Sequence, residues 1–63
     1  MKITFYKYSK KVYQTTDAEL KRIPNIGEFM CIDKVGYNVV NIHTTFDTIT
    51  KEVELIICLN KCN

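Results

Sequence analysis

The stretch Glu52-Val53-Glu54-Leu55-Ile56-Ile57-Cys58-Leu59 decides the fold. Its first half alternates between polar and apolar residues, which is the period of a β-strand with one buried face. The apolar members of this series should face the core: Val53, Leu55, Ile57 and Leu59. At Ile56 and Cys58 the opposite face also becomes apolar, as expected where a short helix, the amino-terminal strand or another molecule covers it.

Two further strands are expected before this one, at residues 28–33 and 37–46. Pro24-Asn25-Ile26-Gly27 has the composition of a turn, and Asp33-Lys34-Val35-Gly36 predicts a hairpin loop with Gly36 in the left-handed conformation. Residues 47–51 form the next turn. On the middle strand the alternation places Tyr37 and Val39 on one face and Val40 and Ile42 on the other. Residues 28–59 should therefore form a three-stranded meander.

The amino-terminal part predicts a strand and a short helix. Residues 2–8 are rich in aromatic and β-branched residues, with Ile3 and Phe5 on one face. Residues 12–15 either continue this strand after a bend or pair back onto it. Thr16-Asp17-Ala18-Glu19 fits a capping box and predicts a helix within residues 16–22, which ends before Pro24 because proline disfavours helical geometry at the preceding residue.

Together these elements predict a single mainly β domain over residues 1–63. The expected fold is an SH3-like or related five-stranded antiparallel barrel or curled sheet with one short helix. A chain of 7.4 kDa buries about 60% of the surface that it exposes when unfolded, so its stability should be small. Residues 60–63 are expected to be a frayed polar tail.

The cysteines and the amino terminus favour a reducing compartment. An odd set of three, Cys31, Cys58 and Cys62, predicts free thiols rather than a disulfide framework. The amino terminus lacks the apolar central region of a secretory signal, and no apolar run approaches the ~20 residues of a membrane span. The expected location is the cytoplasm, without a membrane partner.

No motif carries a catalytic or metal-binding prediction. Cys31, Cys58, Cys62 and His43 supply soft ligands, but they lack the paired spacing of zinc sites. His43, the single histidine, should share a polar, solvated face with Asn41 and Thr45. The acidic residues Asp33, Asp47, Glu52 and Glu54 are interpreted as solubilising side chains. We therefore expect a protein without enzymatic activity, cofactor or metal.

Two binding signals remain. Aromatic, sulfur-containing and aliphatic residues predict a protein interface made of Tyr6, Tyr8, Met30, Tyr37, Ile56 and Cys58. The first 13 residues hold four lysines and no acid, and lysines interleaved with rings are typical of single-stranded nucleic-acid binders. The residues of this alternative are Lys2, Phe5, Tyr6, Lys7, Tyr8, Lys10, Lys11 and Tyr13. The protein interface is the stronger interpretation because a pI near 8.5 is low for a nucleic-acid domain.

Residues 23–59 carry a family resemblance. Ile23-Pro24-Asn25-Ile26-Gly27-Glu28, followed by Tyr37-x-Val39 and an alternating strand, resembles small uncharacterised proteins encoded by bacteriophages and prophages. Met30 and Cys31 replace the small aliphatic residues usual there. The resemblance implies a phage origin and a binding or inhibitory role. The sequence thus predicts a modulator or inhibitor of a host protein, with a homodimer as one arrangement and a minor virion component as a further alternative.

Overall fold

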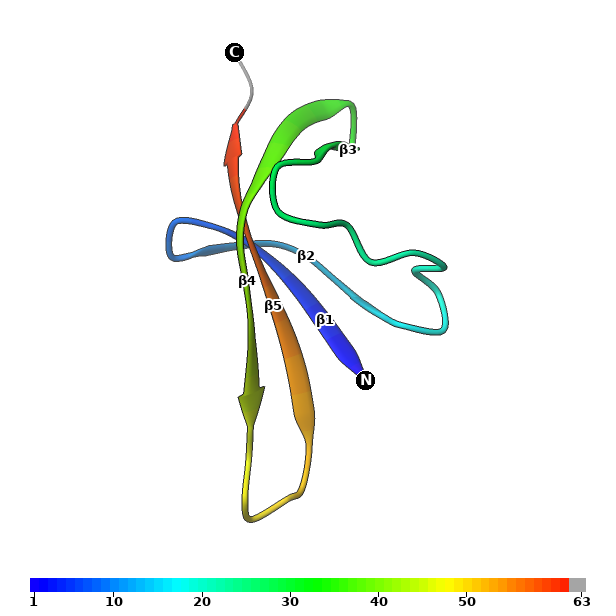
Figure 1. Cartoon of the computed structure of the whole chain (residues 1–63), viewed down its shortest axis with the longest axis vertical. Helices are drawn as coiled ribbons and strands as arrows, with labels where there is room; N and C mark the ends of the chain where they lie inside the picture. The colour runs from blue at the N-terminus through cyan, green and yellow to red at the C-terminus, as the bar shows by residue number, and fades with distance from the viewer. Residues whose placement is uncertain (62–63) are drawn as a thin grey trace.

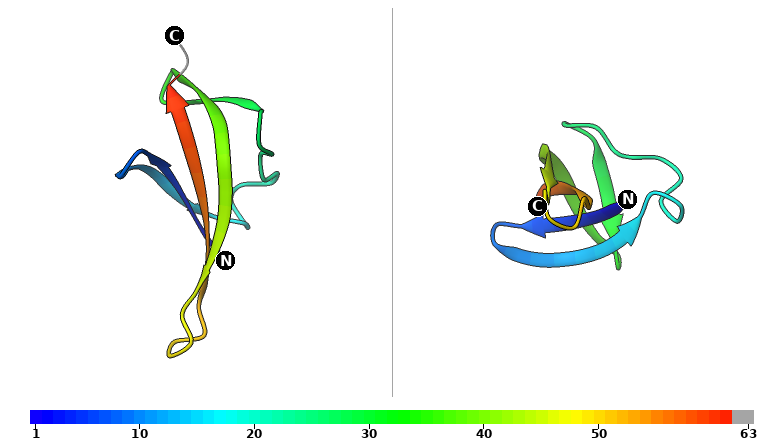
Figure 2. Two further views of the ribbon diagram at one scale, coloured as in Figure 1. Left: turned by 60° about the vertical axis from the view of Figure 1, so that its left-hand side comes forward. Right: turned by 90° about the horizontal axis from the view of Figure 1, so that it is seen from below.

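A computed structural model describes residues 1–61 as one curled sheet of five strands (Figure 1). The strands are β1 (Lys2–Lys7), β2 (Lys10–Thr16), β3 (Phe29–Ile32), β4 (Val35–Phe46) and β5 (Val53–Lys61). Their order across the sheet is β2-β1-β5-β4-β3. The curled sheet forms half of a barrel with a concave face (Figure 2). The prediction of a mainly β fold with five strands is confirmed.

The carboxy-terminal meander is also confirmed, since β3, β4 and β5 pair in succession as antiparallel neighbours. At the amino terminus the open alternative is resolved, because β2 pairs back on β1 as an antiparallel hairpin. The expectation of a wholly antiparallel sheet was wrong at one place. β1 and β5 are parallel, with Lys2 opposite Glu54 and Lys7 opposite Leu59.

Ile56 of β5 is buried although it lies on the face opposite the core. β5 lies between β1 and β4, so strands flank it on each side. The cross-strand neighbours of Ile56 are Thr4 on β1 and His43 on β4. Ile56 is 9% exposed, and we attribute its burial to these neighbours, because the side chains of cross-strand partners lie on the same face and contact one another.

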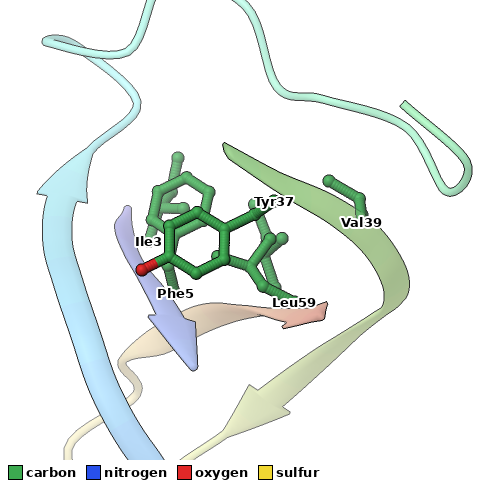
Figure 3. Close-up of a cluster of buried hydrophobic side chains, with 6 residues drawn as sticks. Ile3, Phe5, Tyr37, Val39 and Leu59 are labelled. Carbon is green, nitrogen blue, oxygen red and sulfur yellow. The ribbon is translucent and has the colours of Figure 1, made fainter. Parts of the chain in front are cut away.

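The core occupies the concave face (Figure 3). Register places Ile3 and Phe5 of β1 on the same face as Ile57 and Leu59 of β5. Tyr37 and Val39 of β4 complete the buried cluster. Burying an aromatic or large aliphatic side chain contributes about 1.5–3 kcal/mol, so six such residues provide the main favourable term in folding.

A bulge in β4 corrects the predicted face of one residue. The register shifts between Val39 and Asn41, so the chain gains one residue there and the alternation reverses. Ile42 then lies opposite Ile57 and packs against the core, although uninterrupted alternation had placed it with Val40 on the other face. His43 is exposed and shares a face with Asn41 and Thr45, as predicted.

The predicted helix at 16–22 is absent. The hydroxyl and the carbonyl of Thr16 accept hydrogen bonds from the amide of Glu19, and the carbonyl also accepts one from Leu20, at 2.9 Å, but only a single turn forms. Residues 17–28 must join β2 to β3, the two edges of the sheet. A helix between Thr16 and Pro24 has room for only about two turns, and helices this short are not stable by themselves. Beyond this turn the connection has no regular structure, and it contributes Leu20 to the core.

Two predictions about loops and ends were also wrong in detail. The β3–β4 loop consists of Asp33 and Lys34, which have positive φ angles of 51° and 67°, while Gly36 lies within β4. The turn before β3 does use Gly27 at φ 91°. Asn60 and Lys61 are paired with Asn38 and Tyr37 rather than frayed. The rest of the predicted tail, residues 62–63, lies outside the described residues.

Candidate functional site

The predicted protein interface is divided by the fold. Its six residues were Tyr6, Tyr8, Met30, Tyr37, Ile56 and Cys58. Tyr37 belongs to the core, and Ile56 is buried within the sheet. Tyr6 and Cys58 lie opposite each other on the convex face and are half-buried. Met30 packs against the core from β3. Only Tyr8 is fully available to a partner, with 82% of its surface exposed.

The predicted nucleic-acid set is divided as well. By register, Lys2, Tyr6 and Lys11 lie on the convex face of the β1–β2 hairpin. Phe5, Lys7, Lys10 and Tyr13 lie on the concave side, where the Phe5 and Tyr13 rings are 6.2 Å apart. The set therefore forms no continuous stacking platform. What remains together is the end of the hairpin.

This end, residues 7–11, is called the basic tip. It contains Lys7, Lys10 and Lys11 and no acidic residue. Lys7 and Lys10 are cross-strand neighbours, although like charges in such a pair are destabilising. Between them Tyr8 has a φ of 58°, a conformation that is unfavourable for a bulky residue. The Lys7 Nζ lies 5.9 Å from the centre of the Tyr8 ring. The two-residue turn requires this backbone conformation, and it leaves the Tyr8 ring exposed among the three lysines.

A second exposed surface was not predicted as a site. The β4–β5 hairpin extends beyond the start of β1, because β1 begins opposite Glu54 (Figures 1 and 2). At this end Phe46 and Val53 form a cross-strand pair. Phe46 is 57% exposed and Ile49, within the turn, is 90% exposed. We call residues 46–54 the acidic tip; they hold three acids, Asp47, Glu52 and Glu54, and one lysine, Lys51.

The acidic tip is built around Asp47. Its carboxylate accepts hydrogen bonds from the amides of Ile49 at 2.9 Å and Thr50 at 3.2 Å. These backbone donors hold the pKa of Asp47 below its ordinary value of 3.8. Two backbone hydrogen bonds join Asp47 to Lys51 and Glu52 and close the turn. Ile49 is therefore held outward by an ordered turn, in which an apolar residue is unusual.

A hollow of about 520 Å³ adjoins this turn. Its apolar lining comes from Phe46, Ile49 and Val53, and its charged lining from Asp47, Glu52, Glu54 and Lys2. The Glu54 carboxylate also accepts a hydrogen bond from the buried Thr4 hydroxyl. Three acids against one lysine give the hollow a negative balance. The hollow is a surface depression that is open to solvent, not an enclosed cavity.

The turn that carried the family resemblance has a structural role. Glu28 accepts hydrogen bonds from Arg22 Nη2 at 2.7 Å and from the amide of Asn25 at 2.9 Å. Arg22 is the largest cause of the lowered pKa of Glu28. At the other end of the same connection, the terminal amino group of Met1 pairs with Asp17 at 3.0 Å and lowers its pKa.

The remaining titratable candidates are dispersed. Cys31 lies on edge strand β3, while Cys58 and His43 lie on central strands, and both cysteines are free thiols. Within residues 1–61 no three histidine, cysteine, aspartate or glutamate residues gather as a metal site. Cys62 lies outside the described residues. Asp33 is in the β3–β4 loop, away from the acids of the acidic tip.

Comparisons with protein-family models, with curated proteins and with solved structures find no match to this chain. Within residues 1–61 there is no helix long and apolar enough to cross a membrane. The candidate site is therefore defined by geometry and charge alone.

Proposed function

We propose that this chain is a non-enzymatic protein-binding module whose contact surface is the acidic tip. The observation that carries the proposal is the outward position of Ile49 beside Phe46 on a projecting hairpin. Apolar anchors surrounded by polar groups are the usual centres of protein interfaces. The acidic lining of the hollow specifies the partner further: it should present an apolar or aromatic side chain flanked by lysine or arginine.

A module of this size acts by occupying a surface of its partner in a fixed ratio. The resemblance of residues 23–59 to phage-encoded proteins makes a host protein the candidate partner, with modulation or inhibition as the result. The SH3-like classification of the half-barrel and a cytoplasmic location are parts of the same proposal.

The test is capture from a bacterial lysate with matched variants. The native chain, Ile49→Lys and Val40→Lys are immobilised separately, and bound proteins are identified by mass spectrometry. Val40 is a suitable control because it is also an exposed apolar residue of the same hairpin but lies away from the hollow. A protein retained by the native chain and Val40→Lys, lost with Ile49→Lys, and bound again in purified form supports the proposal. Equal retention by all three chains would refute it.

Binding of single-stranded nucleic acid is the second candidate function. It is favoured by Tyr8, which is exposed among the three lysines of the basic tip, since rings stack on bases while lysines neutralise phosphates. Titration with an oligothymidylate should show binding that weakens steeply between 50 and 200 mM salt, roughly in proportion to the phosphates contacted. Absence of binding at low salt excludes this function.

A further inference from the structure

The two hairpin tips lie at opposite ends of the sheet. β1 and β5 run in the same direction. The β1–β2 turn follows the end of β1, next to Leu59, whereas the β4–β5 turn precedes the start of β5, next to Lys2. Figure 1 shows the two turns well separated. One chain therefore cannot bring its own basic tip to its own acidic tip.

The tips are complementary in charge and in shape. The basic tip carries three lysines around an outward tyrosine ring. The acidic tip offers a hollow of about 520 Å³ with an apolar lining and three carboxylates. The Tyr8 ring flanked by lysines is the kind of aromatic side chain and charge that the proposed function requires of a partner. On contact, Tyr8 and Ile49 would each bury apolar surface that is exposed to water in the single chain.

From this complementarity we infer that the chain self-associates head to tail: Tyr8 of one copy enters the hollow of a second copy, with Lys7, Lys10 and Lys11 facing Asp47, Glu52 and Glu54. The inference rests on the proposed function, because it names a second copy as a partner of the same surface. Contacts between unlike surfaces leave one free tip of each kind on every assembly, so growth continues unless the rotation closes a ring.

The association should be weak and sensitive to salt. Each tip presents only a few side chains, far less than the ~800 Å² per partner of a stable interface. Charge pairs at the rim of the contact are screened as the Debye length falls from about 10 Å at 0.1 M salt to about 3 Å at 1 M. We expect sedimentation equilibrium at 50 mM salt to show assemblies above the monomer at high micromolar concentration, and the association constant to fall about fivefold at 500 mM salt.

The decisive experiment uses two variants that each remove one tip. Tyr8→Gly removes the ring and also relieves the positive φ, so this variant keeps its fold. Ile49→Lys places a cation in the hollow at a residue that is 90% exposed. Each variant alone should sediment as a monomer. Mixed in equal amounts they should form a dimer and nothing larger, because each retains the tip that the other lacks.

Other outcomes overturn the inference. If the native chain remains a monomer at 1 mM, or if the mixture forms no dimer, head-to-tail contact is refuted. If a purified oligothymidylate binds the native chain but not Tyr8→Gly, and no self-association occurs, the basic tip serves nucleic acid instead. The proposed function fails separately: a monomeric chain whose captured protein is lost with Ile49→Lys retains its protein-binding function without self-association.

Discussion

Replacement of Lys34 by glycine should stabilise this protein. Lys34 occupies the second position of the two-residue β3–β4 loop with a φ of 67°, after Asp33 at 51°. Two positive φ angles define a type I′ turn, for which Asp-Gly is a favoured pair. A residue with a Cβ loses about 1–2 kcal/mol in the left-handed conformation. Glycine avoids this cost, but its greater freedom in the unfolded chain offsets about 0.5–1 kcal/mol.

The expected net gain is therefore about 1 kcal/mol in the free energy of unfolding. For a domain of this size, that gain raises Tm by about 4–8 °C. The measurement is thermal unfolding monitored by circular dichroism at one fixed, low micromolar protein concentration. Lys34 takes part in neither of the ion pairs found among residues 1–61, so no salt bridge is lost.

Lys11→Gly is the matched control. Lys11 is also exposed and lies near a hairpin loop, but it belongs to strand β2, has no positive φ and has Tyr6 rather than a lysine as its cross-strand neighbour. Both exchanges remove one positive charge. In a strand, glycine costs about 0.5–1 kcal/mol, so the two Tm changes should have opposite signs. An equal rise in Tm in both variants would show that the loss of a positive charge is the cause. A fall in the Tm of Lys34→Gly would refute the assigned turn geometry.

Three further predictions concern the core, the pH dependence and one buried hydroxyl. Phe5 is fully buried, so Phe5→Ala should cost about 3–5 kcal/mol and leave far-UV circular dichroism typical of an unfolded chain. Arg22 lowers the pKa of Glu28. The ionised Glu28 carboxylate therefore stabilises the folded state above its ordinary pKa of 4.5, and this contribution is lost as pH falls through the lowered pKa. The difference in urea midpoint between the native chain and Glu28→Gln should be largest at pH 7 and vanish near pH 2. Thr4 is buried and donates to the Glu54 carboxylate, so Thr4→Val should cost about 1 kcal/mol in urea unfolding; an equal cost in a Glu54→Ala background would show that this hydrogen bond is not the cause.

The strands could be predicted because alternation is a local signal. β4 and β5 were expected within two residues of their observed ends, and the turn at 47–51 was expected where the Asp47 side chain caps it. The helix prediction was wrong because the capping threonine stabilises one turn, whereas Pro24 leaves too few residues for a stable helix. The prediction of a left-handed Gly36 was wrong because the loop has only two residues, so β4 begins before the glycine.

The candidate site could be predicted only in part. Tyr8 was selected from composition, and the structure leaves it exposed. Tyr37 was predicted as an interface residue because it is aromatic, and Ile56 because the second face of its strand is apolar. Neither property distinguishes a residue buried within its own chain from one at an interface, and both residues are buried. The acidic tip was missed, although Ile49 between Thr48 and Thr50 was a visible signal: an apolar residue in a polar turn has no neighbour to pack against.

The parallel pairing of β1 and β5 is the feature that local patterns do not contain, and it controls the placement of charge. Had β1 joined β5 antiparallel, its turn would lie beside the β4–β5 turn, and lysines and carboxylates would neutralise each other within one molecule. Parallel pairing separates them, so a net charge of only +2 conceals a basic end and an acidic end. A molecule with opposite charges at opposite ends attracts copies of itself in one orientation and repels them in the other. The direction of one strand pair thus makes ordered head-to-tail contact available to a chain whose composition alone would suggest weak electrostatics.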